Sequence, residues 1–277
     1  MKTIHTLKKV SLATFLTFVL SFSSVFAQNG TMYIMKSGAI AGQYNVNTEV
    51  DSVIFYKPTL EGNNTNNGDI VFNPNITYGS ITDIDGNTYK TVTIGTQTWM
   101  AENLKVTKYN DGIAIPNVTD NTAWSELTTG ALCDYDNTPS NSETYGKLYN
   151  WHAVNTGKLC PTGWHVPSDA EWTELTDYLG ENAGGKLKAT GTIEAGTGLW
   201  YDPNTGATNE TGFTALPGGG RDSDGAFDGI GSVGYWWSAT ESGTSDAWFR
   251  GMIYDYSSVG RDHHNKGLGF SVRCLRD

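Results

Sequence analysis

Positive charge is scarce in this sequence. Its 18 lysine and arginine residues stand against 29 acidic residues, so the formal net charge is −11. Such a surface repels phosphate backbones and anionic lipid headgroups, and we therefore expect neither nucleic acid nor a membrane surface as a partner. Beyond residue 27, no apolar run approaches the roughly 20 residues that a membrane-spanning helix needs, so we do not expect a transmembrane protein.

Recognisable catalytic motifs are also missing. The sequence has no His-Glu-x-x-His zinc motif and no Gly-x-Ser-x-Gly nucleophile elbow. The glycine run Gly218–Arg221 lacks the Lys-Ser/Thr ending of a phosphate-binding loop. Adjacent His263 and His264 point to opposite faces of a strand and cannot easily share a metal. His165 lies in an apolar block, where we expect it to be buried and hydrogen-bonded. The sequence therefore predicts a protein that is not an enzyme.

The first 27 residues have the pattern of a secretory signal peptide. Lys8 and Lys9 precede an apolar run over residues 10–22, which is too short for a comfortable membrane span. Val25 and Ala27 then supply small residues at the positions that signal peptidase reads. We expect cleavage after Ala27 and a protein that is secreted or held at the cell surface. The alternative is an uncleaved N-terminal anchor.

Composition divides the rest of the chain into three parts. Residues 28–58 read as a small β-strand leader unit, residues 59–76 as a linker rich in Gly, Asn and Thr, and residues 77–277 as the main domain. Within the leader, the pattern predicts strands at 31–35, 39–46 and 50–56.

The main domain carries several local structure signals. Asp85-Gly86 between two alternating runs predicts a β-hairpin. Ser168 followed by Glu171 forms a capping box that predicts a helix over residues 169–179. The spacing of apolar residues over 145–154 predicts a second, short helix. Antiparallel strands are expected at 235–240, 247–254, 257–262 and 269–275.

Six separated blocks of the main domain occur in an order that one family shares. Among them are Gln-Thr-Trp-Met, Cys-Pro-Thr-Gly-Trp-His and Gly-Phe-Ser-Val-Arg-Cys. The blocks span residues 97–104, 145–151, 160–172, 213–219, 234–241 and 269–274. On these motifs the chain from about residue 80 to 277 resembles the Fibrobacter succinogenes major paralogous domain.

Two of the blocks also resemble more distant proteins. Residues 167–172 and 269–274 are similar to a helix start and a terminal strand of formylglycine-generating enzyme and the wider C-type-lectin-like fold. This resemblance implies an α+β, loop-rich fold with a short helix pair and a twisted antiparallel sheet. The oxidase activity of that enzyme needs a pair of redox cysteines, and no such pair lies between Trp236 and Gly269. We therefore do not carry the activity over.

The chain has only three cysteines. In an exported protein this count suggests one disulfide and one leftover thiol. By the same resemblance, Cys160 just before the capped helix pairs with Cys274 in the terminal strand, which leaves Cys133 free. The alternative is that all three cysteines are reduced.

Two sets of residues in the loop-rich part are candidates for binding. Asp222, Asp224 and Asp228 surround a glycine turn, and alternating carboxylates of this kind suit Ca²⁺; the alternative is an ordinary Asp-Gly surface turn. Aromatic side chains could stack on sugar rings, although packing in the core is the competing role for each. The candidate ligand-binding residues are Trp200, Tyr201, Arg221, Trp237, Trp248 and Tyr256.

These observations favour one function over two others. We expect an exported, non-catalytic binding or adhesion module for glycans or another surface macromolecule such as a surface protein, with its site in the loops between residues 191 and 244. The first alternative is a structural component of a cell-surface assembly. The second is an enzyme distantly related to formylglycine-generating enzyme.

Overall fold

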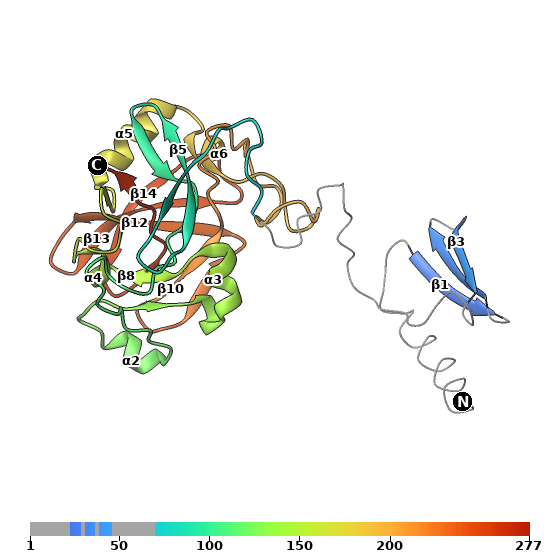
Figure 1. Ribbon diagram of the computed structural model, residues 1–277, viewed down its shortest axis with the longest axis horizontal. Coiled ribbons are helices and arrows are strands. Elements are labelled where there is room, and N and C mark those ends of the chain that lie inside the picture. Colours follow the sequence, from blue (N-terminus) through green and yellow to red (C-terminus); the bar gives the residue numbers. More distant parts are fainter. Residues whose placement is uncertain (1–22, 29–30, 37–38, 46–69) are drawn as a thin grey trace. The chain divides into compact units, whose positions relative to one another are not determined.

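A computed structural model describes residues 23–28, 31–36, 39–45 and 70–277 of the chain. The chain divides into two units at Pro58 (Figure 1). In the N-terminal unit, three antiparallel strands form a sheet in chain order: β1 (Ser23–Gln28), β2 (Thr31–Lys36) and β3 (Ala39–Asn45). The strands expected at 31–35 and 39–46 are confirmed, and the one expected at 50–56 lies outside the described residues.

The expected signal cleavage site falls inside this small sheet. Ala27 lies in β1, opposite Met32 of β2. Cleavage after Ala27 would remove all of β1 except Gln28 and would leave the β2–β3 hairpin as the described strands of this unit. Cleavage itself stays a prediction.

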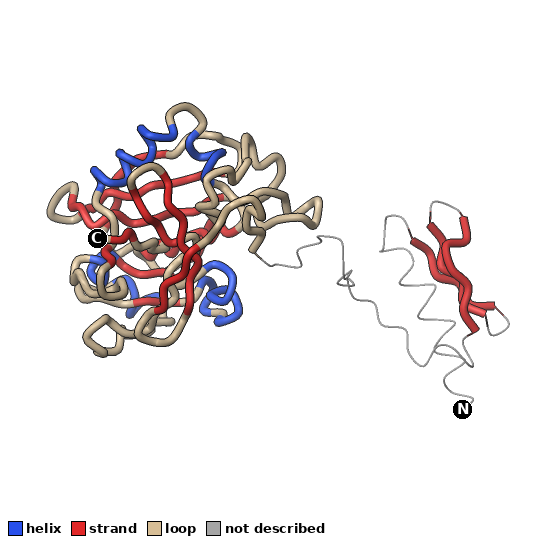
Figure 2. Tube along the Cα trace, turned by 45° about the horizontal axis from the view of Figure 1, so that its top comes forward, coloured by secondary structure: helices blue, strands red, loops and turns tan. Residues whose placement is uncertain are grey.

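The C-terminal unit mixes two curled sheets with short helices (Figure 2). The larger sheet has the order β14 (Gly260–Asn265), β13 (Asp246–Ile253), β12 (Val233–Glu241), β10 (Gly218–Arg221), β15 (Gly269–Phe270), β8 (Leu148–Asn150), β7 (Leu132–Cys133), with β11 (Phe227–Ile230) paired to β10. The smaller sheet has the order β4 (Gly79–Thr82), β5 (Thr88–Ile94), β6 (Gln97–Met100), β16 (Leu275–Arg276), β9 (Trp164–His165). The named strands pair antiparallel, except that β10 and β12 run parallel. The fold is therefore α+β, as expected.

The helices are short and lie at the margins of the strands (Figure 2). They are α2 (Asn121–Ser125), the 3₁₀ turn η1 (Tyr135–Asn137), α3 (Pro139–Tyr145), α4 (Trp151–Val154), α5 (Asp169–Leu179) and α6 (Ala183–Leu187). The capping box of α5 is confirmed: the Ser168 hydroxyl accepts from the Glu171 N–H, and the Glu171 carboxylate accepts from the Ser168 N–H. Trp172 and Leu175 bury the apolar stripe of α5 in the core.

Residues before 77 already belong to the C-terminal domain. Ile70, Phe72 and Ile76 lie within the expected linker, yet all three pack against the core of the C-terminal unit. The Asn73 side-chain amide also donates to the carbonyl of Asn209 at 2.9 Å. The boundary expected at 76 is thus too late, because the stretch after residue 69 carries apolar side chains that the core buries. Residues 59–69 lie outside the described residues.

The helix expected over 145–154 is wrong for most of its length. Gly146 has a positive φ of 76° and ends α3, and Leu148–Asn150 then forms β8 between β7 and β15. Apart from Tyr145, the last residue of α3, only Trp151–Val154 is helical in this range, and the Asn150 side chain caps it by accepting from the Ala153 N–H. Pairing on both sides of β8 outweighs the local helical spacing.

Tryptophans fill much of the core. Of the chain's nine, seven are fully buried: Trp99, Trp124, Trp151, Trp172, Trp200, Trp236 and Trp237. Trp99 and Trp172 approach to 4.7 Å between ring centroids, and Phe213 lies edge-on to both. Few tryptophans therefore remain at the surface for ligand binding.

The pairing of Cys160 with Cys274 is confirmed by a disulfide that joins the segment before β9 to the segment before β16. Cys133 is free and buried in β7, and burial raises the pKa of its thiol to about 12.

His165 in β9 is hydrogen-bonded, to Glu171 at 2.9 Å and Asp277 at 2.6 Å, but it is 37% exposed rather than buried. None of the helices among the described residues combines the length and the apolar character needed to cross a membrane.

Candidate functional site

Three of the expected ligand-binding residues are core residues instead. Trp200, Arg221 and Trp237 are each fully buried. The Trp200 indole N–H donates to the carbonyl of Ala215 at 3.0 Å, and the Trp237 indole N–H donates to that of Tyr149 at 2.9 Å. Buried indoles with satisfied N–H groups serve packing, so Trp200 and Trp237 take the competing core role and not that of ligand contacts.

Arg221 instead fixes the β10–β11 hairpin. Its guanidinium donates to the carbonyls of Gly225, Val118 and Thr119 and to the side-chain oxygen of Asn121. The rings of Trp124 and Phe227 lie on it at 4.4 and 4.7 Å. These contacts occupy the guanidinium, so it has a structural role.

The three aspartates named as candidate Ca²⁺ ligands, Asp222, Asp224 and Asp228, lie in the same hairpin. The Asp224 side chain accepts from the Ala226 N–H, and the backbone of Asp222 pairs with that of Ala226, which closes an Asp-Gly turn. Burial, then the charges of Asp224 and Asp228, raise the pKa of Asp222. Within the described parts of the chain, no group of three or more His, Cys, Asp or Glu side chains could hold a metal ion. The geometry matches the turn alternative.

Tyr201, by contrast, is 40% exposed, and its ring is supported by neighbouring residues. Its backbone N–H donates to the carbonyl of Gly231 at 2.8 Å, and a Cβ on Gly231 would lie 3.0 Å from the Tyr201 ring and 3.2 Å from Ile193. Ile193 is 45% exposed, and the Tyr254 ring stands edge-on to Tyr201 at 6.2 Å. We call Ile193, Tyr201, Gly231 and Tyr254 the Tyr201 patch.

The loop that carries the patch is anchored in the core. Trp200, next to Tyr201, is buried, and its carbonyl accepts from the Ile193 N–H at 2.8 Å. Gly231 has a positive φ of 82°, and its missing side chain lets Tyr201 and Ile193 lie directly on the backbone. The exposed side chains therefore sit on a preorganised support.

Two further tyrosines, Tyr135 and Tyr145, have pKa values that Tyr201 helps to raise. Burial, and then the field of Tyr201, raise the pKa of Tyr145 to about 12. The pKa of Tyr135 is also raised, mainly by burial, with a smaller contribution from Tyr201. The hydroxyls of Tyr135 and Tyr145 stay protonated at neutral pH, so they can both donate and accept hydrogen bonds. Sequence reasoning missed Tyr135 and Tyr145, because they lie more than 50 residues from Tyr201 in the chain.

A buried lysine shapes the end of β13 next to the patch. The Lys188 ammonium donates to the carbonyls of Ile253 and Tyr256 at 3.0 and 2.8 Å. Desolvation by burial lowers the pKa of Lys188 to about 8. These bonds hold the turn after β13, which carries Tyr254 of the patch and presents the expected ligand residue Tyr256, 59% exposed.

Trp248 is the remaining expected ligand residue, and it is partly covered. The guanidinium of Arg261 stacks 3.5 Å from the centroid of its ring, and His263 lies edge-on at 5.2 Å. Asp169 pairs with Arg261 and with the buried Arg250, which holds this stack against α5. One ring face of Trp248 is thus already occupied.

The comparison with known families decides where the chain belongs. The family model of the Fibrobacter succinogenes major domain matches residues 92–276. The chain belongs to this family. No curated protein and no solved structure matches it. The likeness to formylglycine-generating enzyme and the C-type-lectin-like fold stays a prediction.

The family blocks of this Fibrobacter succinogenes major domain meet in its core. Arg273 is fully buried and donates to the Asn103 side-chain oxygen at 2.8 Å and to the carbonyls of Phe213 and Thr214. The Trp236 indole donates to the same Asn103 oxygen at 2.9 Å. Four separate blocks therefore meet in one buried polar cluster. These residues of the blocks hold the core together and do not form a surface site.

Proposed function

We propose that this member of the Fibrobacter succinogenes major domain family is an exported, non-catalytic module that binds glycans through the Tyr201 patch. The observation that carries the proposal is the exposed ring of Tyr201, held on the Gly231 backbone beside exposed Ile193. A rigid aromatic face next to protonated hydroxyls suits a sugar, which has one apolar ring face and a rim of hydroxyl groups.

The expected energy is modest. Full burial of an aromatic side chain is worth about 1.5–3 kcal/mol, and a ligand can cover only the 40% of Tyr201 that is exposed. One hydrogen bond to the Tyr201 or Tyr145 hydroxyl adds about 0.5–1.5 kcal/mol. Together the two terms amount to about 1–3 kcal/mol, or about ten- to a hundredfold in affinity. A single patch therefore binds weakly, and display of several copies would strengthen the binding.

An array of neutral oligosaccharides tests the proposal with a matched pair of variants. Tyr201→Ala should weaken binding about tenfold. Tyr178→Ala should not, although Tyr178 is 66% exposed, because it lies on α5 against Gly95 and outside the patch. Saturable binding that Tyr201→Ala leaves unchanged would refute the site.

A flat array would refute glycan binding, and capture of other surface proteins by the same chain would then favour a component of a surface assembly. Export is tested separately, by N-terminal sequencing of the secreted form. We expect it to begin at Gln28, and retention of residues 1–27 would point to the uncleaved anchor.

A further inference from the structure

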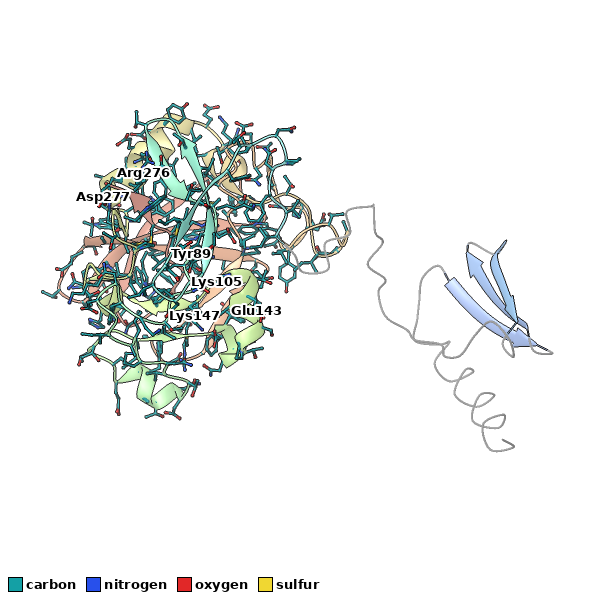
Figure 3. The ribbon with its side chains drawn as sticks, viewed as in Figure 1. Tyr89, Lys105, Glu143, Lys147, Arg276 and Asp277 are labelled. Atoms are coloured by element: carbon teal, nitrogen blue, oxygen red, sulfur yellow. A yellow bond between two sulfur atoms is a disulfide. The ribbon has the colours of Figure 1, made fainter. Side chains whose placement is uncertain are left out.

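A polar hollow lies on another part of the domain. It is bounded by the turn between β4 and β5, by the segment that follows β6, and by α3, and its volume is about 350 Å³. Lys105, Glu143 and Lys147 line it, and Figure 3 labels these three side chains. We call it the Lys105 hollow. Its volume is in the range of small-molecule sites.

The hairpin wall of the hollow is held rigidly. The buried Asp83 carboxylate accepts from the N–H groups of Asp85 and Asn87, from the Asn87 side-chain amide, and from the Tyr89 hydroxyl at 2.6 Å. The Tyr89 hydroxyl in turn accepts from the Lys105 N–H at 3.0 Å. The turn and the segment that carries Lys105 are therefore fixed before any ligand arrives.

Two charged residues of the lining already have ion-pair partners. Asp85 pairs with Lys108 at 2.9 Å, and Lys147 pairs at 2.6 Å with the buried Asp134, which does not itself line the hollow. The Ser142 hydroxyl also donates to Asp134. These pairs leave Lys147 held in place, with ammonium protons to spare for a ligand.

Lys105 and Glu143 are the two charged groups of the hollow that have no ion pair within residues 70–277. The Lys105 ammonium lies 5.9 Å from the Tyr89 ring centroid, while Glu143 is exposed on α3. An ammonium without a carboxylate partner is unexpected in a chain where acidic groups outnumber basic groups by 29 to 18. The hollow thus offers the ammonium groups of Lys105 and Lys147 together with the carboxylate of Glu143, which has no ion pair within residues 70–277.

From this arrangement we infer that the Lys105 hollow binds a carboxylate-bearing sugar, with the ligand carboxylate on Lys105 and Lys147 and its ring hydroxyls on Glu143 and the Asn87 side-chain oxygen. Charge-assisted bonds to the carboxylate supply the selectivity for an acidic sugar over a neutral one. The site uses no residue of the Tyr201 patch, so either site can exist without the other.

The test is a titration of the full chain with D-glucuronate and with D-glucose, followed by amide shifts in NMR spectra. We expect glucuronate to bind at least about tenfold more tightly than glucose and to shift the amides of Asn87 and Thr107. Lys105→Met should weaken glucuronate binding about tenfold, while Lys105→Arg should keep most of it. Lys158→Met is the control, because Lys158 is an exposed lysine paired with Asp111 outside the hollow.

The inference is overturned by equal binding of glucose and glucuronate, by no binding of glucuronate, or by Lys105→Met binding as tightly as wild type. Shifts at Gly231 in place of Asn87 and Thr107 would assign glucuronate to the Tyr201 patch and would also refute the hollow. Thermal melting of each variant checks that a lost signal does not come from lost folding.

Discussion

The disulfide between Cys160 and Cys274 makes a prediction that can be worked through from the structure. It closes a loop with a sequence separation of 114 residues. In the chain-entropy model, a loop of this length restricts the unfolded chain by about 4–5 kcal/mol at 25 °C. Both cysteines are buried, so alanine is the appropriate replacement, because a serine hydroxyl would be left without partners.

We expect the double variant Cys160→Ala and Cys274→Ala to lose about 4 kcal/mol in its free energy of unfolding. With an m value of about 2 kcal/mol per M, the urea midpoint falls by about 2 M. Reductant should produce a similar loss in the wild-type chain and none in the double variant. Under denaturing, non-reducing conditions one thiol should titrate, that of Cys133.

Three titratable thiols without reductant would refute the disulfide, because no bond would then exist. A loss of less than about 1 kcal/mol in the double variant would refute the chain-entropy account, because the bond would then restrict the unfolded chain very little. Native wild-type protein supplies a further check. The buried Cys133 thiol, with its raised pKa of about 12, should react slowly until the chain unfolds.

Two further predictions concern charged side chains. Arg221→Met should cost about 3 kcal/mol in urea unfolding, because it removes a fully buried guanidinium and leaves its four acceptors without their donor. Arg261→Met, at an exposed ion pair, should cost less than about 1 kcal/mol. Equal losses would contradict the structural role of Arg221. Burial lowers the pKa of His165, but hydrogen bonds to Asp277 and Glu171 outweigh it and the pKa is raised overall. The folded state therefore holds this proton more tightly, so stability present below the ordinary pKa of 6.5 is lost as pH rises through the raised pKa. His165→Gln should flatten that dependence of melting temperature on pH, and an unchanged slope would refute it.

Local signals in the sequence determined several features of this protein. The capping box at Ser168 and Glu171 and the Asp-Gly turn at residue 85 act within a few residues, so they can be read without a fold. The family blocks determined the family, and the resemblance they carry led to the pairing of Cys160 with Cys274. The α+β class followed from the same blocks.

Tertiary structure alone decided which side chains reach the surface. Trp200 and Tyr201 are neighbours in the chain, yet one is fully buried and the other is 40% exposed. The segment over 148–150 became a strand because β7 and β15 pair with it from distant positions.

Both proposed sites depend on contacts of this long-range kind. The Tyr201 patch needs Gly231 beneath the ring, and the Lys105 hollow needs the turn after β4 beside α3. Sequence patterns report local preference and periodicity. Burial, register and convergence are set by packing between segments that lie far apart in the chain, and only the folded structure brings those segments together.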